Sequence, residues 1–502
     1  MVVPVHACTL VPTCGAAPRA TTSQALQLPP NPALPGLRLV TPKSHLFYWE
    51  SQKCLLRASH KPGNNGHRDA RRSEGKPEML SPAAKQNGAP SLEGMKVLVL
   101  AQSELAQSPR MLNHARALCD AGPSVSLVGW TQLPLPEDIT RSPRLSVHRI
   151  SEAGAERLDA VPRTFYVPTA ASRAARATMR LGWLLAAKSG RFDVAIVQNP
   201  PALPAVLLAL VAARARGARV IVDWHGRTAA MLALSLGREH EAVWAVNRAE
   251  AWLARRASAH FAVSDAMRED LRARFGIDAT VLYDRPRRRT TLLNAEQRLA
   301  IIRRVLAARG LTSGTDHSFI LVSPSSFGAD EELDMLLHAL ATAVRWSPDL
   351  PILLFATGFG PLRPEFEARA REIATGNLRI VTGWLAEPLY RDLLSAADLG
   401  ISMHRSASRV GLPMRIVDMI EAGLPALVLN YGPVLTELVP PALQPLMFSD
   451  ADGLATHLGE LLDGAKLAAL HAKMALADGP LWSEEWRRVA LPLIAASDRI
   501  RV

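Results

Sequence analysis

Short apolar runs alternate with amphipathic segments along most of the chain from residue 95 onward. The first runs read "MKVLVLAQ" (95–102), "SVSLVGW" (124–130) and "FDVAIVQN" (192–199). Apolar runs of this length predict strands that are buried on both faces of a parallel sheet. The segments between them carry apolar residues at helical spacing, and strands that alternate with helices build doubly wound sheets. The pattern therefore predicts an α/β protein whose strands are mainly parallel.

The alternation occurs in two series, which predict two domains. A chain of 502 residues is too long for a single hydrophobic core. The first series spans 95–290 and the second spans 318–480. We expect a linker with one helix at 291–317 and an amphipathic helix at 481–502.

The predicted elements can be given by residue range. The first series has further strands at 145–150, 218–224, 259–264 and 280–286, and helices at 108–122, 170–188, 201–215, 240–256 and 265–275. The second series has strands at 318–326, 351–358, 378–384, 399–404 and 425–430, and helices that start at 330 and 361 or cover 386–396, 414–422 and the region near 436. Ser108 as N-cap, Pro109 at the first helical position and Gly122 after the last turn mark the first helix.

The segment 1–94 lacks this periodicity. It consists of Pro-rich, Gly-rich and polar tracts that bury little apolar surface, so we expect a disordered extension. Its first 49 residues contain no Asp or Glu, as in a transit peptide. Translation from Met95 is the other interpretation, and the sequence leaves both open.

Composition narrows the classes of function. The formal net charge of +12 indicates attraction to anionic membranes or diphosphate groups, unless it reflects only an Arg-rich surface. Aromatic residues make up 5% of the chain, and no nucleic-acid-binding motif is present, so we expect no nucleic-acid partner. The four cysteines (Cys8, Cys14, Cys54 and Cys119) show no CxxC spacing, which indicates a reducing compartment without a structural zinc site. The apolar run 201–213 is too short to span a membrane, which takes about 20 residues.

Polar side chains follow the predicted strands at the edge of the sheet where α/β proteins bind ligands. Asp223, Trp224 and His225 end the strand "RVIVDWH", and we expect all three to emerge there. His225 is the candidate general base, and Asp223 would fix its tautomer. The alternative is that His225 is a structural residue at the end of the strand, with its hydrogen bonds satisfied within the protein. Glu250 on the next long helix is a second candidate base, or a solvated helical acid.

The turn after the first strand predicts an anion site. Ser108 and Arg110 lie at a helix N-terminus, where backbone N–H groups and a guanidinium favour a diphosphate. His114 lies one turn further along and is either part of this site or structural. Asn199 ends another strand, either as a helix N-cap or as part of the ligand-binding edge.

The second series has two loops suited to phosphate groups. Ser325 lies in "SPSSFGADEELD" (323–334), where small residues precede a helix N-terminus. Gly358 and Gly360 follow the next strand in "ATGFGP", a turn that lets the backbone approach a ligand. The loop 323–334 also contains Asp330, Glu331 and Glu332. Acids are typical of the first turn of a helix, where the helix dipole favours negative charge.

Several motifs together resemble one enzyme family, the chitobiosyldiphosphodolichol β-mannosyltransferases. They include "VQNPPALP", "VIVDWH", "VLYDRP", "DLGISMHRSASRVGLPMRIVDM" and "SEEWRRVALPL". The resemblance covers Met95 to about Ala496 and excludes the first 94 residues. It implies the GT-B glycosyltransferase fold, in which two Rossmann-like domains face a cleft.

The resemblance also implies a reaction. Mannose would pass from GDP-mannose to dolichyl-diphosphate-linked chitobiose, forming a β-1,4-mannoside on the cytoplasmic face of the endoplasmic reticulum membrane. Conversion of an α-linked donor into a β product is one inverting displacement, which needs a base and stabilisation of the leaving diphosphate. We expect no metal cofactor, because enzymes with this fold use cations and helix N-termini instead. No DxD motif ends a predicted strand, in agreement with that expectation.

The resemblance assigns donor-binding roles to the region 404–437. His404 and Ser406 would face the nucleotide sugar, Arg415 would supply a cation, and Asp418 would accept hydrogen bonds from the ribose. Glu437 is a further ribose candidate, or a helix-surface acid. The chain departs from the family pattern at Phe359, where Lys is common, at Arg409 in place of Gly, at Gly411 in place of Asp, and in the first loop near Ala101.

A lipid-linked acceptor implies a membrane surface as a partner, besides other transferases of the same pathway. The segment 166–187 mixes Arg with Leu, Trp and Met and is predicted to be a membrane-facing helix, or else an ordinary packed helix. The departures from the family pattern leave two alternative functions open. One is a transferase with another donor or lipid acceptor, and the other is a non-catalytic paralogue that binds a nucleotide sugar.

Overall fold

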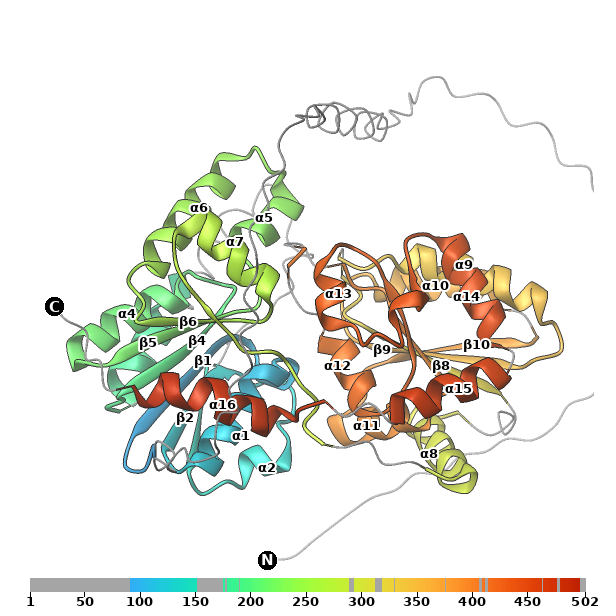
Figure 1. Ribbon diagram of the computed structural model, residues 1–502, viewed down its shortest axis with the longest axis horizontal. Coiled ribbons are helices and arrows are strands. Elements are labelled where there is room, and N and C mark those ends of the chain that lie inside the picture. The colour runs from blue at the N-terminus through green and yellow to red at the C-terminus, as the bar shows by residue number, and fades with distance from the viewer. Residues whose placement is uncertain are drawn as a thin grey trace, which may run out of the picture. The chain divides into compact units, whose positions relative to one another are not determined.

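Two open parallel sheets form the framework of the computed structural model (Figure 1). The structure describes the residues 91–150, 175–176, 178–188, 190–288, 293–311, 318–328, 330–374, 376–405, 409–410, 414–462, 464–475 and 479–496. The strand orders are β3-β2-β1-β4-β5-β6-β7 and β10-β9-β8-β11-β12-β13, and every printed strand pair is parallel. Each order reverses direction beside its first strand, as in doubly wound folds. The predicted α/β class with two Rossmann-like domains is confirmed.

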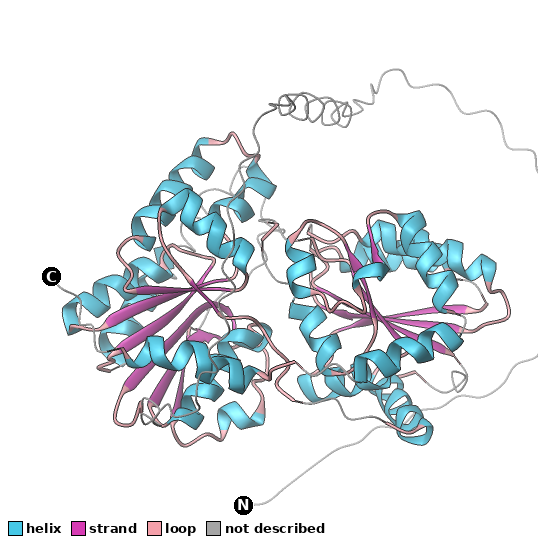
Figure 2. Cartoon of the chain, in the orientation of Figure 1, coloured by secondary structure: helices cyan, strands magenta, loops and turns pink. Residues whose placement is uncertain are grey.

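The first lobe contains the seven-stranded sheet, and helices flank its strands (Figure 2). Its strands are β1 (Lys96–Glu104), β2 (Ser124–Trp130), β3 (Leu145–Arg149), β4 (Val194–Asn199), β5 (Arg219–Trp224), β6 (Ala259–Ala262) and β7 (Thr280–Val281). Its helices are η1 (Leu105–Gln107), α1 (Pro109–Ala121), α2 (Glu137–Thr140), η3 (Leu184–Lys188), α4 (Ala205–Arg216), α5 (Thr228–Leu236), α6 (Glu241–Ala254) and α7 (Asp265–Phe275).

The second lobe contains the six-stranded sheet. Its strands are β8 (Phe319–Ser325), β9 (Ile352–Gly358), β10 (Leu378–Gly383), β11 (Leu399–Ser402), β12 (Ala426–Leu429) and β13 (Met447–Phe448). Its helices are α8 (Ala295–Ala308), α9 (Leu333–Trp346), α10 (Arg363–Ile373), α11 (Glu387–Ala396), α12 (Met414–Glu421), α13 (Val434–Leu438), η4 (Gln444–Leu446), α14 (Ala451–Leu461) and α15 (Gly464–Ala475). The last helix of the chain is α16 (Trp482–Ala495).

Each sheet separates two hydrophobic cores, because side chains alternate between its faces. Along β1, Leu98 and Leu100 belong to one core while Val97 and Val99 belong to the other. This is the period of two that every strand imposes on its side chains. The continuous apolar runs are therefore central strands with helices against both faces.

The helix predicted in the linker belongs to the second lobe. Ile302, Val305 and Leu306 on α8 are buried in one core of that lobe. Asn294 and Gln297 start the helix with a capping box, in which each side chain satisfies a backbone N–H group of the other. This helix therefore adds a layer to the second domain instead of standing between the two domains.

The C-terminal helix returns to the first lobe. Trp482, Trp486 and Ile494 on α16 are buried in the core that β1 and α1 form. The guanidinium of Arg219 donates to the carbonyl oxygens of Leu493, Ile494 and Ala496 at distances of 3.1, 3.2 and 2.6 Å. These bonds satisfy carbonyl groups that the end of a helix leaves free. Residues nearly 400 positions away from β1 thus complete the first domain.

Two predicted helix starts differ in the structure. Ser108 precedes α1, but its hydroxyl donates to the carbonyl oxygen of Glu104 at 2.9 Å and makes no cap bond. Asn199 is not a helix N-cap, because α4 begins at Ala205. By contrast, Ser264 caps α7 by accepting from the N–H of Met267 at 3.0 Å.

The segment predicted as a membrane-facing helix, 166–187, lies partly outside the described residues. The structure describes 175–176 and 178–187 of it as helical. Within the described part of the chain, no helix has the length and apolar character needed to cross a bilayer.

We expect Trp486→Ala to lower the free energy of unfolding of the first lobe by about 3 to 5 kcal/mol, because it removes a fully buried indole. Urea unfolding monitored by circular dichroism measures this change. Arg487→Ala, one residue further along the exposed side of the same helix, is the matched control and should stay within about 0.5 kcal/mol. Equal effects of the two substitutions would show that α16 is not part of the core.

Candidate functional site

The carboxylate of Asp223 is the centre of a buried polar cluster at the end of β5. It accepts from Arg110 Nε at 2.8 Å and Nη2 at 2.9 Å, and it lies 3.2 Å from His114 Nε2 and 2.9 Å from His225 Nε2. Burial alone would raise the pKa of Asp223, but the charge of Arg110 and the hydrogen bonds from both histidines hold that pKa well below its usual value. Asp223 is therefore ionised at neutral pH.

Arg110 does not reach the surface, which corrects the expectation that it contacts a diphosphate directly. Its side chain is fully buried, and its Nη1 donates to Asp284 Oδ1 and to the carbonyl oxygen of Leu282, each at 2.8 Å. Burial opposes the charged form, but the two neighbouring carboxylates raise its pKa. Ser108 is also buried, so both residues support the site from the interior of the lobe and do not face a ligand.

His114 is held in one tautomer by the C-terminal helix. The indole Nε1 of Trp486 can only donate a hydrogen bond, and it lies 3.1 Å from His114 Nδ1. His114 Nδ1 must therefore accept, so the proton is on Nε2 and points to Asp223. Burial lowers the pKa of His114, which keeps the ring neutral. His114 thus supports Asp223 and has no exposed surface for a ligand.

Of the three residues expected to emerge at the end of β5, only His225 does so. Trp224 is buried and donates to His260 Nδ1 at 3.1 Å, and Asp223 is inaccessible. The side chain of His225 is 23% exposed. Because Asp223 is ionised, His225 Nε2 donates to it and Nδ1 becomes the acceptor of the ring. A carboxylate–imidazole pair of this kind can remove a proton from a hydroxyl group.

Glu250 and Asn199 fix the loop that carries His225. Glu250 is buried, and its Oε1 accepts from Asn199 Nδ2 and from the backbone N–H of Thr228, both at 2.8 Å. Asn199 Nδ2 also lies 3.2 Å from the carbonyl oxygen of Gly226. The expected solvent-exposed alternative for Glu250 is thus wrong, and its carboxylate holds the start of α5.

A cavity of about 470 Å³ collects most of the residues that were predicted to bind the donor. Ser325, Gly358, His404, Arg415 and Asp418, which come from four separate segments of the second lobe, all line it. Residues of α1 in the first lobe line it as well, among them Asn113 and Arg116. His225, Gly360 and Glu437 are not part of this lining, and Ser406 lies outside the described residues.

The loop after β8 lines this cavity, and the carboxylate of Glu331 holds the loop in place. The sequence pattern had predicted this acid in the first turn of a helix. Glu331 precedes α9 and is buried; its Oε1 accepts from the N–H and hydroxyl of Ser326 at 2.9 and 3.0 Å. Its Oε2 accepts from the hydroxyl of Ser325 and from the N–H of Phe327. Arg415 forms an ion pair with the same carboxylate. The pattern "SSFGADE" contained this signal, since an acid six and five residues after two serines can accept from both hydroxyl groups and close a loop.

His404 is anchored beside this loop. Its Nδ1 lies 3.1 Å from Asp330 Oδ2, and the backbone N–H of Arg405 donates to the carbonyl oxygen of Asp330 at 2.8 Å. The hydrogen bond from His404 lowers the pKa of Asp330. The imidazole that faces the cavity is therefore held by a charged acceptor.

The two glycines after β9 bring loops of the protein together. A Cβ atom on Gly358 would lie 1.7 Å from the carbonyl oxygen of Ser325, and one on Gly360 would lie 1.7 Å from that of Ser326. The expected close approach of backbone is thus made to the loop after β8. Arg409 has a φ of 58°, a left-handed conformation that glycine adopts at lower cost.

Asp418 lies half-buried on α12 at the wall of the cavity. Burial raises its pKa to about 7, although Arg391 opposes this shift. The hydroxyl of Tyr390 donates to its Oδ2 at 3.3 Å. Asp418 therefore offers, at the position where the family resemblance implies a ribose contact, a carboxyl group that exchanges a proton near neutral pH.

Glu437 has a different partner from the expected ribose. Its carboxylate accepts from the backbone N–H groups of Asp265 and Ala266 at 2.5 and 3.3 Å, and from the hydroxyl of Tyr283 at 2.8 Å. The N-terminus of α7 favours a negative charge at this place. Glu437 therefore joins the two lobes and does not line the cavity.

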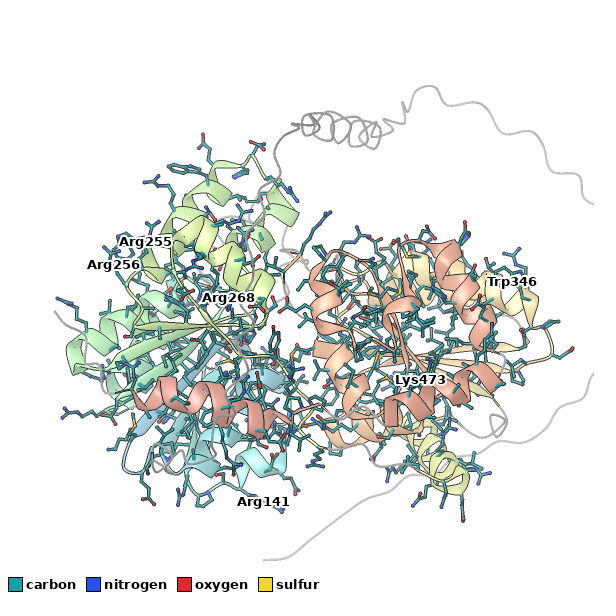
Figure 3. All side chains as sticks on the ribbon, viewed as in Figure 1. Arg141, Arg255, Arg256, Arg268, Trp346 and Lys473 are labelled. Atoms are coloured by element: carbon teal, nitrogen blue, oxygen red, sulfur yellow. The ribbon has the colours of Figure 1, made fainter. Side chains whose placement is uncertain are left out.

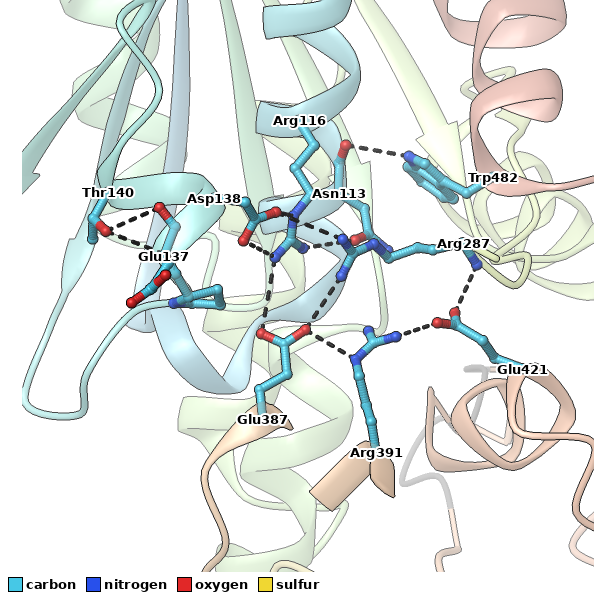
Figure 4. Close-up of polar contacts among 11 residues, drawn as sticks. Asn113, Arg116, Glu137, Asp138, Thr140, Arg287, Glu387, Arg391, Glu421 and Trp482 are labelled. Atoms are coloured by element: carbon cyan, nitrogen blue, oxygen red, sulfur yellow. Dashed lines mark hydrogen bonds and ion pairs between the residues drawn. The ribbon is translucent and has the colours of Figure 1, made fainter. Parts of the chain in front are cut away.

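An ion-pair network that the sequence did not indicate borders the cavity (Figure 4). Glu387 lies 3.0 Å from Arg391, 3.2 Å from Arg287 and 3.9 Å from Arg116. Arg116 pairs with Asp138 at 2.5 Å, and Arg391 pairs with Glu421. Burial is the main cause that lowers the pKa of Arg287 to about 10. Arg116 and Arg391 line the cavity, so cations of both lobes face it.

The chain matches known glycosyltransferases. A family model described as a glycosyl transferase 4-like domain matches residues 106–283. The chitobiosyldiphosphodolichol beta-mannosyltransferase of Kluyveromyces lactis is 31% identical over 368 residues, or 71% of this chain and 79% of that protein. UDP-glycosyltransferase TURAN of Arabidopsis thaliana is 29% identical over 80% of this chain and 97% of that protein.

The solved structures show the same fold with little identity. The N-terminal domain of the Candida albicans trehalose-6-phosphate phosphatase covers 80% of this chain and 97% of its own length, with a TM-score of 0.54 and 12% identity. This likeness concerns the fold alone.

We expect Asp223→Asn to destabilise the first lobe by about 3 kcal/mol, because it removes the charge that compensates the buried Arg110. Urea unfolding of the purified chain measures the loss. Asp278→Asn, an exposed acid of the same lobe, is the control and should change little. An Asp223→Asn protein as stable as the control would contradict the network described above.

Stability should also depend on Asp418 in a defined pH range. The folded pKa of about 7 exceeds the usual value of 3.8, so the folded chain holds a proton that the unfolded chain releases between these values. The wild type should therefore lose stability relative to Asp418→Asn as pH rises from 4 to 8, by a few kcal/mol at most. Urea midpoints of both proteins across this range test the sign, and parallel curves would exclude the shift.

Proposed function

The chain belongs to the chitobiosyldiphosphodolichol beta-mannosyltransferase family, and we propose that it transfers mannose from GDP-mannose to dolichyl-diphosphate-linked chitobiose, forming a β-1,4 bond. The chain is a glycosyltransferase with the GT-B fold. The observation that carries the proposal is the cavity where Ser325, Gly358, His404, Arg415 and Asp418 meet. Loop chemistry had predicted Ser325 and Gly358 at a phosphate site, and motif resemblance had predicted His404, Arg415 and Asp418 at the donor site.

The donor would occupy this cavity through its diphosphate and ribose. The N-terminus of α12 carries Arg415 and offers free N–H groups and a partial positive charge to a diphosphate. Asp418, one turn further along, would accept hydrogen bonds from the ribose hydroxyls. Arg116 and Arg391 add cations at the border, which would compensate for Phe359 at the place where relatives carry Lys.

The reaction would be a single displacement with inversion. The 4-hydroxyl oxygen of the terminal GlcNAc attacks C1 of mannose while the bond from C1 to the GDP oxygen breaks. His225 Nδ1 takes the hydroxyl proton, and Asp223 stabilises the imidazolium that forms. The cationic groups of the second lobe stabilise the charge on the leaving GDP. Because His225 lies outside the cavity lining, the mannose of the donor would extend from the cavity to the acceptor hydroxyl beside His225.

No metal cofactor takes part in the proposed reaction. The charge of the diphosphate would be balanced by arginines and helix N-termini. We place the activity on the cytoplasmic face of the endoplasmic reticulum membrane, where other transferases of the same pathway are potential partners.

A second candidate is transfer from a UDP-sugar. It is favoured by the Arabidopsis relative, whose name specifies a UDP-glycosyltransferase and which this chain covers to 97%. Competition between unlabelled UDP-sugars and labelled GDP-mannose separates the two donors.

Purified chain incubated with radiolabelled GDP-mannose and phytanyl-diphosphate-chitobiose should form a β-mannosylated lipid that a β-mannosidase releases. The product should form equally with and without EDTA. GDP binding without any product would instead support a nucleotide-sugar-binding paralogue.

We expect His225→Ala to reduce kcat by a factor of about 10² to 10⁴, because the acceptor loses its base, while the affinity for GDP stays unchanged. Initial rates and isothermal titration with GDP measure the two quantities. His338→Ala, which alters an exposed histidine on α9, is the matched control. Wild-type rates in His225→Ala would assign proton removal to another group.

A further inference from the structure

Exposed large hydrophobic side chains are more frequent in the first lobe than in the second. Ten large hydrophobic side chains are exposed in the described part of the chain, and eight of them lie between Met179 and Trp252. Four of the eight, Met231, Leu236, Trp244 and Trp252, belong to the adjacent helices α5 and α6. Adjacent exposed apolar side chains mark an interaction surface, whereas single ones are ordinary.

Helix α6 presents an alternating row of tryptophan and arginine to solvent. Trp244 is 64% exposed and Trp252 is 48% exposed, and they lie two turns apart on the same side of the helix. Arg248 lies between them, with its guanidinium 4.9 Å from the ring centroid of Trp244. The guanidinium of Arg256 lies 3.6 Å from the ring centroid of Trp252. Each indole is therefore paired with a cation at the protein surface.

Helix α5 packs beside α6 and adds apolar surface (Figure 1). Its sequence "TAAMLALSL" contains no charged residue, and Met231 and Leu236 are exposed. An apolar helix next to a helix with a tryptophan–arginine face is typical of proteins that lie on a membrane interface.

The charges of this surface favour an anionic partner. Arg248 is exposed on α6, and Arg255 and Arg256, which directly follow the last residue of the helix, are exposed as well (Figure 3). The acids of α6 do not offset them along the helix, because Glu241 lies in the first turn and Glu250 is buried. Guanidinium groups at this density attract phosphate groups of lipids.

We propose that the exposed faces of α5 and α6 form a docking surface for an anionic phospholipid bilayer. Trp244 and Trp252 would insert their rings at the level of the headgroups, and the arginines beside them would contact lipid phosphates. α5 begins three residues after His225, so the bilayer would lie next to the loop that carries the proposed base. This last consequence rests on the proposed function, since it would bring a lipid-linked sugar to His225 while its lipid stays in the membrane.

Vesicle flotation of the full-length chain tests the surface. Phosphatidylcholine vesicles with about 30% phosphatidylserine should carry the chain, and pure phosphatidylcholine vesicles should carry much less. The double variant Trp244→Ser/Trp252→Ser should partition at least about tenfold more weakly. Trp346→Ser is the matched control, because Trp346 is 56% exposed on the second lobe, and it should partition like the wild type.

An arginine double variant and a measurement of oligomeric state distinguish lipid binding from other uses of this surface. Arg248→Gln/Arg256→Gln should lose the preference for phosphatidylserine, and near-ultraviolet circular dichroism verifies that each variant is folded. Wild-type partition by the tryptophan double variant, or no flotation of the wild type with either lipid, would overturn the proposal. Size-exclusion chromatography that shows a wild-type dimer and a monomeric double variant, without vesicle binding, would assign the surface to self-association and also overturn it.

An activity readout separates this proposal from the proposed reaction. In detergent micelles, the tryptophan double variant should transfer mannose at the wild-type rate, whereas in vesicles containing the acceptor it should be slower by at least about tenfold. Absence of transfer by the wild type in micelles would reject the reaction and leave the flotation result to decide the surface.

Discussion

The buried charge of Asp223 is the constraint on which the first lobe depends. A carboxylate without access to water is unfavourable unless cations and hydrogen-bond donors surround it. Arg110 from α1, His114 one turn later and His225 from the strand end meet this requirement together. Asp284 accepts a further hydrogen bond from Arg110, and Trp486 fixes the proton of His114. One acid therefore determines how β5, α1, the segment after β7 and α16 fit together.

The same principle organises the second lobe. Glu331 is a buried acid whose oxygens are occupied by two serines, backbone N–H groups and Arg415. In both lobes, an interior carboxylate positions a loop at the carboxyl end of the sheet, where the ligands of doubly wound folds bind. In each lobe the buried carboxylate therefore holds its neighbours in place. The groups that face the cavity include the imidazole of His404 and the guanidinium of Arg415.

Positive charge connects these sites to the proposed chemistry. The reaction would release a diphosphate, and its lipid-linked acceptor also carries one. Arginines of both lobes line the cavity, and arginines also flank the exposed tryptophans of α6. A single electrostatic preference for phosphate groups would therefore serve substrate binding and the inferred attachment to a bilayer.

The sequence by itself determined the local elements and identified many of the residues that line the cavity. The periods of two and 3.6 residues are local properties, so strands such as 95–102 and the α/β class were predictable. Loop chemistry pointed to Ser325, and motif resemblance pointed to His404 and Asp418, which line the same cavity. The helices α5, α14 and α15 were missed. α5 has no side-chain cap, and α14 and α15 follow no predicted strand. Only the tertiary structure decided which polar groups are interior. Arg110 and Asp223 are 113 positions apart, and His114 and Trp486 are 372 apart. No local pattern encodes pairings over such separations, because they arise only when the sheet brings distant helices to the same edge.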